Sequence, residues 1–218
     1  LFFLTSVIKA VDICAPLLRL SAANSGNDHR LGANEAPPAI ISIFLGDQLS
    51  SILDDLVNGN AHSKQNETME IGVNTLPSFP RDLTDRNRTS PFAFTGNKFE
   101  FRMVGSLQSL AGPNVILNSA TAMVLNEAAD RLERSNNPME EIKRIITESY
   151  RSHRRVIFNG NGYSEEWVRE AEKRGLPNLA STVESLPELM RDEFVQMFED
   201  LRVFSRAELA SRKDIYLE

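Results

Sequence analysis

Three short, strand-like segments set between regions of helical periodicity restrict the fold most strongly. The first, Ala39 to Leu45, is a continuous apolar run bounded by a proline and a glycine, which is typical of a buried strand. Ser90 to Phe94 and Phe99 to Met103 suit two further strands, and the intervening Thr95-Gly96-Asn97-Lys98 is typical of a hairpin turn. The chain is therefore expected to contain both a sheet and helices.

The segments around these strands carry apolar residues at helical spacing. The first such segment runs from Phe3 to Leu18, and Pro16 is expected to kink or split it because an interior proline removes a backbone hydrogen bond. Asn24 to Asn27 are turn residues that we expect to end it. Further helices are expected from Asp47, acting as the cap, to Val57, from Pro113 to Asn136, from Pro138 to Arg155, from Ser164 to Gly175, and after the capping boxes that begin at Ser181 and Ser205.

Composition excludes several classes of protein. The formal net charge is −6 and no basic face is obvious, which argues against a nucleic-acid-binding role. Cys14 is the single cysteine, which excludes an intramolecular disulfide and fits a cytoplasmic protein. The apolar opening, Leu1 to Ile8, is too short to span a bilayer and lacks the basic start of a signal peptide, so no membrane partner is expected. Because the chain starts without Met, inside an apolar helical pattern, we expect a fragment of a longer protein.

Charged residues gather in two clusters, residues 27–38 and residues 86–102, on segments predicted to be turn-rich or extended rather than helical. A guanidinium grips carboxylate and phosphate groups bidentately, and a glutamate among several guanidiniums can bind a divalent cation. The clusters therefore suit a substrate that carries both anions, with a cation between them. The candidates are the anion clamps Arg30, Arg88 and Arg102 and the metal-binding carboxylate Glu100.

Each candidate also has a purely structural explanation. Arg30 would then be a turn arginine in a surface ion pair, and Glu35 would be a solvated acid in a loop. Glu100 and Arg102 lie two residues apart on a predicted strand, so they face the same side of it. That pattern also fits an exposed strand face with weak cross-strand pairing.

At these residues the chain resembles glutamine synthetases of the long type III class. Residues 26–46 and 86–106 carry the resemblance, and residues 156–178 are similar to the C-terminal extension of that class. The resemblance implies an α+β fold in which antiparallel strands of a larger curved sheet are flanked by helices. It further implies that residues 1–136 form the C-terminal part of the catalytic domain, with an insertion at 58–85, and that residues 137–218 form a helical C-terminal extension.

The resemblance also implies a role for each charged candidate. Arg30 and Arg102 would hold the substrate glutamate. Glu35 would lie in a flap that shields a γ-glutamyl phosphate from water, and it would accept a proton from ammonium. Arg88 would contact the transferred phosphate and the nucleotide, since phosphoryl transfer spreads negative charge over oxygens that a guanidinium can stabilise. Glu100 would ligate magnesium or manganese.

The nucleotide side of the site is less complete. Many glutamine synthetases carry a second phosphate-side arginine at the position of Ala93, and Lys98 is a candidate to supply charge near ATP instead. The aromatic segment from Phe158 to Trp167 could stack on a nucleotide, but a packing or subunit contact is the preferred interpretation.

The implied reaction is the ATP-dependent ligation of ammonia to L-glutamate, which gives L-glutamine through a γ-glutamyl phosphate. The family assembles as rings of six subunits that stack into dodecamers, so a homo-oligomer is expected, and the fragment alone is expected to be inactive. Two alternatives stay open. One is another carboxylate–amine ligase on the same fold, and the other is a non-catalytic regulatory paralogue.

Overall fold

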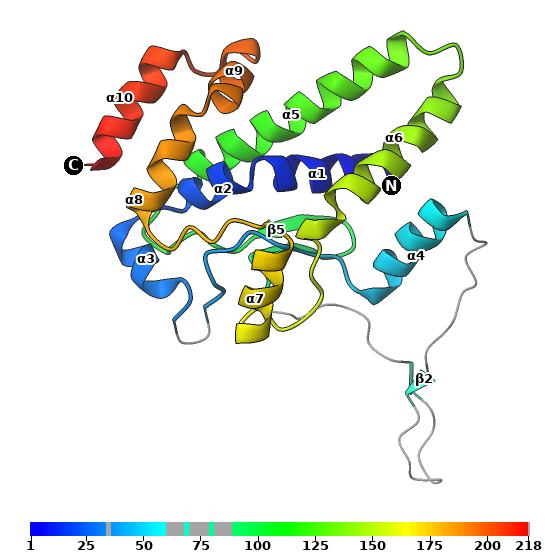
Figure 1. Cartoon of the computed structure of the whole chain (residues 1–218), viewed down its shortest axis with the longest axis horizontal. Coiled ribbons are helices and arrows are strands. Elements are labelled where there is room, and N and C mark those ends of the chain that lie inside the picture. The colour runs from blue at the N-terminus through cyan, green and yellow to red at the C-terminus, as the bar shows by residue number, and fades with distance from the viewer. Residues whose placement is uncertain (34–35, 60–67, 70–78, 81–88, 218) are drawn as a thin grey trace.

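The computed structural model describes residues 1–33, 36–59, 68–69, 79–80 and 89–217. Helices α1, α5 and α6 lie together above a small sheet in the view of Figure 1, and α7 lies below it. The helices are α1 Phe2–Ile13, α2 Ala15–Ser21, α3 Ser25–Arg30, α4 Asp47–Asn58, α5 Ala111–Glu133, α6 Pro138–His153, α7 Glu165–Lys173, α8 Thr182–Ser185, α9 Asp192–Asp200 and α10 Arg206–Leu217, with short 3-10 turns η1 Arg154–Val156 and η2 Leu186–Met190.

The main sheet is small and mixed, in the order β1-β4-β5, which gives the expected α+β class. Strands β4 (Phe92–Phe94) and β5 (Phe99–Phe101) form the expected antiparallel hairpin. Strand β1 (Ile43–Phe44) instead runs parallel to β4, so the expectation of antiparallel strands holds for only part of the sheet. A parallel pair needs a long crossover connection, and the chain between β1 and β4 contains α4 and a second antiparallel pair, β2 (Thr68–Met69) and β3 (Phe79–Pro80).

The apolar run at residues 39–45 is buried as predicted, but only its end belongs to the sheet. Ile40 makes an isolated antiparallel bridge to Asn178, and Ile43 makes a parallel bridge to Ile157. The run thus lies between the sheet and the C-terminal segment of the chain.

Pro16 splits the opening helix as predicted, because α1 ends at the cap residue Cys14 and the proline lies in the first turn of α2. The predicted end of the helix at Asn24 to Asn27 is wrong. Asn24 caps a new helix, α3, by accepting a hydrogen bond from the backbone nitrogen of Gly26. The first charged cluster therefore begins on helical backbone, with Arg30 as the last residue of α3.

Other helix starts differ slightly from the prediction. Gly46 caps α4 with a φ of 81°, so Asp47 is the first helical residue and not the cap. Helix α5 begins at Ala111, so Pro113 is its third residue, where its missing N–H is still tolerated. The predicted capping boxes at Ser181 and Ser205 both form, through reciprocal bonds with Glu184 and Glu208.

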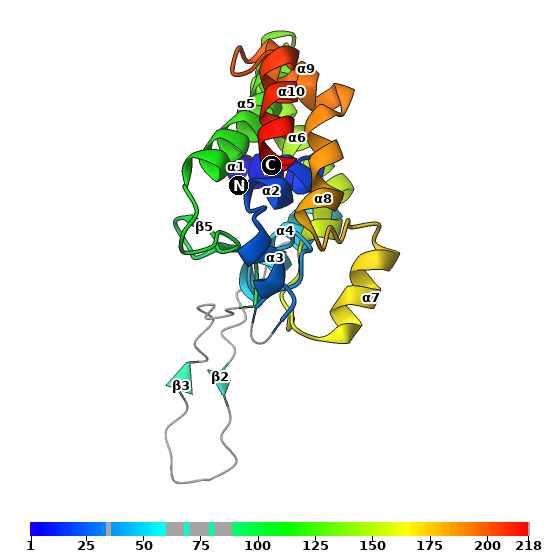
Figure 2. The same cartoon turned by 90° about the vertical axis from the view of Figure 1, so that its left-hand side faces the viewer.

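The core is continuous from the first helix to the last. Ile8, Leu17 and Leu18 are fully buried, and α1 packs against both α5 and α6. Figure 2 shows α10 and α9 at the top of the molecule, where α10 packs against η2 and α9. Trp167 is 1% exposed and stacks on Phe158 with 3.8 Å between ring centroids, so this aromatic pair is part of the packing.

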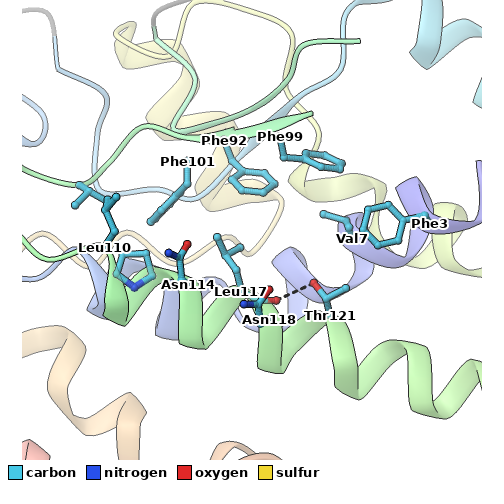
Figure 3. Close-up of a pocket in the computed structure, with 12 residues that line it drawn as sticks. Phe3, Val7, Phe92, Phe99, Phe101, Leu110, Asn114, Leu117, Asn118 and Thr121 are labelled. Carbon is cyan, nitrogen blue, oxygen red and sulfur yellow. Dashed lines mark hydrogen bonds between the residues drawn. The ribbon is translucent and has the colours of Figure 1, made fainter. Parts of the chain in front are cut away.

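The two faces of β5 differ in character. Figure 3 shows Phe99 and Phe101, with Phe92, pointing toward α1 and α5 around an apolar pocket of about 290 Å³. Because side chains alternate along a strand, Glu100 and Arg102 are directed to the opposite face. The sheet thereby separates an apolar side from a charged side. None of the helices in the described part of the chain combines the length and the apolar character that crossing a bilayer requires.

Candidate substrate site

Arg30 is held at the end of α3 by neutral acceptors. Its Nε donates to Oδ1 of Asn27 at 2.7 Å, and its Nη2 donates to the carbonyl oxygen of Met103 at 2.5 Å. Within the described residues Arg30 makes no ion pair, so the surface ion pair offered as its structural explanation is not formed there. Among the described residues its positive charge is oriented but has no carboxylate partner, which suits an anion clamp.

Asn27 is the residue that organises this corner, and sequence reasoning missed its role. The side chain is almost fully buried, with the residue 4% exposed. Its Nδ2 donates to the carbonyl oxygens of Ala22 at 2.6 Å and Met103 at 2.9 Å, while its Oδ1 accepts from Arg30. Asn27 therefore fastens the end of α2 and the guanidinium of Arg30 to the segment that directly follows β5.

Glu100 and Arg102 face the same side of β5, as the strand period predicts. Arg102 donates to Oε2 of Glu100 from Nη2 at 2.9 Å and from Nε at 3.2 Å, and Lys98 Nζ lies 3.2 Å from Oε1. The hydrogen bonds from Arg102 and then from Lys98 lower the pKa of the Glu100 carboxyl below its ordinary value. Glu100 is thus held as a carboxylate between two cations.

The described residues do not by themselves fit a divalent cation. Both oxygens of Glu100 face cationic groups, and no group of three or more His, Cys, Asp or Glu side chains with metal-binding geometry occurs among the residues that the structure describes. Magnesium prefers several oxygen ligands in octahedral geometry. Glu100 can supply one ligand at most, and the others would have to come from elsewhere.

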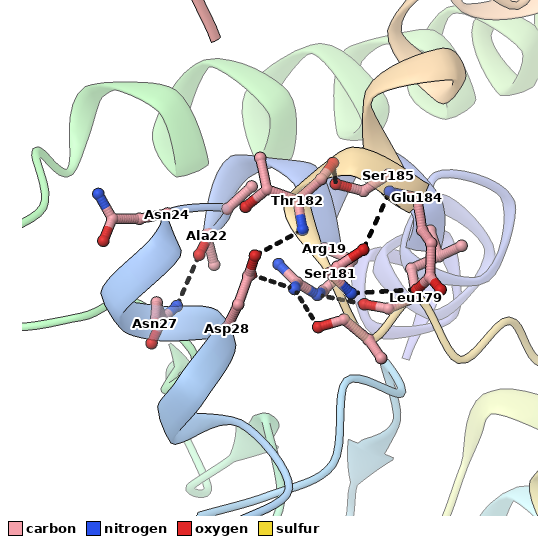
Figure 4. Close-up of polar contacts among 12 residues, drawn as sticks. Arg19, Ala22, Asn24, Asn27, Asp28, Leu179, Ser181, Thr182, Glu184 and Ser185 are labelled. Atoms are coloured by element: carbon pink, nitrogen blue, oxygen red, sulfur yellow. Dashed lines mark hydrogen bonds and ion pairs between the residues drawn. The ribbon is translucent and has the colours of Figure 1, made fainter. Parts of the chain in front are cut away.

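A buried ion pair ties α3 to the C-terminal part of the chain (Figure 4). Arg19 on α2, 1% exposed, donates from Nη2 to Oδ1 of Asp28 at 2.7 Å, and from Nε to the carbonyl oxygen of Leu179 at 2.7 Å. Oδ2 of Asp28 accepts from the backbone nitrogen of Thr182 at 2.6 Å. An arginine inside the apolar run of α2 was the signal in the sequence, but its partners lie too far along the chain to be read from it.

Glu35 and Arg88 lie outside the described residues, and only their neighbours can be placed. The backbone nitrogen of Gly32 donates to the carbonyl oxygen of Pro37 at 2.9 Å, which joins the two flanks of the loop that contains Glu35. Thr89, which follows Arg88, accepts a hydrogen bond through Oγ1 from the backbone nitrogen of Gly162 at 2.9 Å. The segment around Gly162 therefore contacts the second charged cluster, a link that the sequence did not suggest.

Lys98 and Arg102 both contact Glu100 of β5, and Arg30 is joined to the residue after Arg102 through the carbonyl of Met103. Two of these residues, Arg30 and Arg102, are connected through adjacent backbone positions, since Arg30 binds the carbonyl of Met103. Such a site can hold an anion with several carboxylate or phosphate oxygens.

Comparison with known proteins agrees with the α+β fold described above. Residues 141–218 match the family model of the glutamine synthetase C-terminal domain. The class of protein that the chain resembles is therefore that of the glutamine synthetases. Over its full length the chain is 45% identical to the type-3 glutamine synthetase of Dictyostelium discoideum, and it covers 30% of that protein.

Two bacterial relatives show the same pattern. The chain is 46% identical to a glutamine synthetase of Butyrivibrio fibrisolvens and 44% identical to one of Bacteroides fragilis, and covers 31% of each. All of this chain is aligned in both cases. The chain therefore corresponds to one part of these proteins, and it spans about a third of the length of the curated relatives it matches. The resemblance read from the sequence is confirmed.

Proposed function

We propose that this chain forms the C-terminal part of the catalytic region, with part of the C-terminal extension, of an enzyme that ligates ammonia to L-glutamate at the expense of ATP. The single observation that carries this proposal is the placement of Arg30, which is oriented by neutral acceptors and has no ion pair with a described residue, beside the segment that bears Glu100 and Arg102. The names of the relatives supply the reaction.

Arg30 and Arg102 are the proposed contacts for the substrate carboxylate. The described partners of Arg30 are an amide oxygen and a carbonyl oxygen, neither of which offsets its charge. Arg102 shares Glu100 with Lys98, so the strand carries a net positive charge near the bound anion. Lys98, more exposed than either partner, is the proposed contact on the nucleotide side.

The chemical steps fall to Glu35 and Arg88, whose side chains lie outside the described residues. In the proposed mechanism the γ-phosphoryl group of ATP passes to the glutamate side chain, and Arg88 stabilises the charge on the transferred group. Ammonium then loses a proton to Glu35, and ammonia attacks the γ-glutamyl phosphate and expels phosphate. Closure of the Glu35 loop would keep water from the acyl phosphate.

The cofactor and assembly are also part of the proposal. Mg²⁺ or Mn²⁺ would neutralise phosphate charge when bound, and Glu100 would contribute one of its ligands. A homo-oligomer of stacked hexameric rings in the cytoplasm follows from the resemblance alone. So does the division of the chain into a catalytic part, residues 1–136 with an insertion at 58–85, and an extension, residues 137–218.

The test uses the full-length parent protein. Wild-type protein should form glutamine from glutamate, ammonium and ATP with magnesium. Arg30→Ala and Arg102→Ala should each weaken glutamate binding by roughly 1.5–3 kcal/mol, the strength of a charge-assisted hydrogen bond, and leave ATP binding nearly unchanged. Arg134→Ala, at the exposed end of α5, is the matched control.

Two outcomes would redirect the proposal. Activity with another amine and none with ammonium would indicate a different carboxylate–amine ligase. Absence of any ligase activity in a folded full-length protein would favour a regulatory paralogue. Unchanged glutamate affinity in both arginine variants would refute the assignment of the site.

A further inference from the structure

A second pocket lies at the opposite edge of the sheet from the candidate substrate site. It has a volume of about 420 Å³ and is formed by the first two turns of α4, the end of α6, η1 and the segment that follows it, and the residue after α7. Ile157 in its wall bridges to Ile43 of β1, whereas the candidate substrate residues lie on β5 at the other edge. The two sites are therefore separated by the width of the sheet.

The lining of this pocket is strongly basic. Among the described residues that line it are four arginines and a single carboxylate, Asp54, so the lining carries a net charge of +3. The whole chain carries −6. Positive charge is thus concentrated here against the average of the molecule, which favours the approach of an anion. The arginines are Arg151, Arg154, Arg155 and Arg174.

Two of the arginines are anchored through one side of the guanidinium. Nε of Arg155 binds the buried carboxylate of Asp12 at 2.8 Å, and Nε of Arg174 binds Glu170 at 2.8 Å while its Nη1 donates to the carbonyl oxygen of Ile157. In the described part of the chain, Nη2 of neither arginine has a hydrogen-bond partner. The anchors fix the planes of both groups and leave donors for a ligand.

The positive charges of the other two arginines are less fully offset by carboxylates. Arg151 donates from Nη2 to the carbonyl oxygen of Val57 at 2.7 Å and makes no ion pair with a described residue. Arg154 lies 3.4 Å from Asp54 and stacks over the ring of Tyr150. The charge of Arg151 is therefore available to a bound anion, and that of Arg154 is shared with Asp54.

A neutral donor completes the lining. Asn159 accepts hydrogen bonds from the backbone nitrogens of Leu45 and Gly46 and donates from Nδ2 to Oγ of Ser50 at 3.0 Å. Because Oγ of Ser50 accepts that bond, its own hydroxyl proton can be donated to a ligand. The asparagine thus orients a hydroxyl that lines the pocket.

We infer that this basic pocket binds a small phosphate-bearing molecule. A phosphate carries more charge and more acceptor oxygens than a carboxylate, and it can engage several guanidiniums at once. The volume lies within the range of small-molecule sites, about 300–1,000 Å³. The site is independent of the proposed ligase reaction, since none of its residues belongs to that site.

The test measures binding of three probes to the full-length parent protein at low ionic strength, by titration calorimetry. The probes are inorganic phosphate, pyrophosphate and glycerol 3-phosphate. At least one should bind, and binding should weaken as NaCl is added. The double variant Arg151→Gln/Arg154→Gln should lose affinity by roughly 100-fold, about tenfold for each charged donor. Arg155 is left intact because its loss would strand the buried Asp12.

The matched control removes two positive charges from α6 and α7 outside the pocket. Arg144 on α6 and Arg169 on α7 are 64% and 68% exposed, and Arg144→Gln/Arg169→Gln should change affinity less than about twofold. Circular dichroism and thermal melting check that both double variants fold. If Arg151→Gln/Arg154→Gln does not fold, the binding test is carried out with the single variant Arg154→Gln.

The outcomes separate the ligand sources. Tighter binding of glycerol 3-phosphate than of phosphate assigns the site to an organic phosphate, and equal binding assigns it to the free anion. The inference is overturned if none of the probes binds at millimolar concentration, or if the control variant loses as much affinity as the pocket variant.

Discussion

Asp28→Asn should lower the free energy of unfolding by about 3 kcal/mol at neutral pH. Asp28 is the only carboxylate partner of Arg19 among the described residues, and Arg19 is 1% exposed. The remaining bonds of Arg19 go to carbonyl oxygens, and its buried Nη1 has no described partner. Breaking a buried ion pair costs about 3–5 kcal/mol, and the lower end applies because the Asp28 side chain is 18% exposed and asparagine keeps an acceptor.

The effect should depend on pH in a defined direction. Burial raises the pKa of Asp28, but the hydrogen bonds from Arg19 and Thr182 outweigh it and leave the pKa below the ordinary value of 3.8. A carboxylate whose pKa falls on folding adds stability above its unfolded pKa and loses it as the pH falls through the folded pKa. The difference between wild type and Asp28→Asn should therefore be constant above about pH 5 and shrink below about pH 4.

Urea unfolding followed by far-UV circular dichroism measures both quantities. Glu165→Gln is the matched control, because Glu165 is 87% exposed in its ion pair with Arg169 and should cost at most about 1 kcal/mol. A loss for Asp28→Asn no larger than that of the control, or a loss of equal size at every pH, would contradict the assignment of the buried pair.

Three further predictions concern other parts of the molecule. Gly162→Ala should destabilise the chain, because a Cβ there would lie 2.7 Å from the carbonyl oxygen of Thr89. Gly112→Ala on α5 meets only an ordinary contact at 3.7 Å and should stabilise the chain by about 0.5–1 kcal/mol. Thermal melting measures both variants, and a change of melting temperature in the same direction for both would contradict the packing. Burial and the nearby Glu193 raise the pKa of the Cys14 thiol to about 12. Cys14 should therefore resist iodoacetamide in the native chain and react only after unfolding, and rapid labelling of the native chain would contradict its burial. In the full-length parent, Glu35→Ala should lower kcat by roughly 10²–10⁴-fold and raise the amount of phosphate released per glutamine formed. A variant with wild-type turnover and a phosphate-to-glutamine ratio near one would exclude both proposed roles of Glu35.

Local signals predicted the elements whose causes are local. The hairpin of β4 and β5 followed from a polar turn between two apolar runs, and the turn closes with a hydrogen bond from the backbone nitrogen of Thr95 to the carbonyl of Lys98. Pro16 split the first helix as its chemistry requires. Helix α3 was missed because the residues that end a helix, such as Asn24, also cap the next one.

Features that depend on distant partners could not be predicted. The parallel pairing of β1 with β4 depends on the path of the chain between them. The burial of Arg19 depends on Leu179, which lies 160 residues away. Of the candidate site, the shared face of Glu100 and Arg102 followed from the period of a strand, whereas the role of Asn27 required knowing that Met103 lies beside it. Their functional roles stay predictions.

The contact between Arg19 and the C-terminal segment has a consequence for how sequences of this kind can diverge. Arg19 is bound there by the carbonyl oxygens of Leu179 and Ala180, and Asp28 by the backbone nitrogen of Thr182. Main-chain atoms are the same for nearly every residue type, so substitutions at these three positions leave the hydrogen bonds in place. A deletion or insertion between Gly175 and Thr182 would instead shift all three groups out of register, so the segment should tolerate changes of residue far better than changes of length.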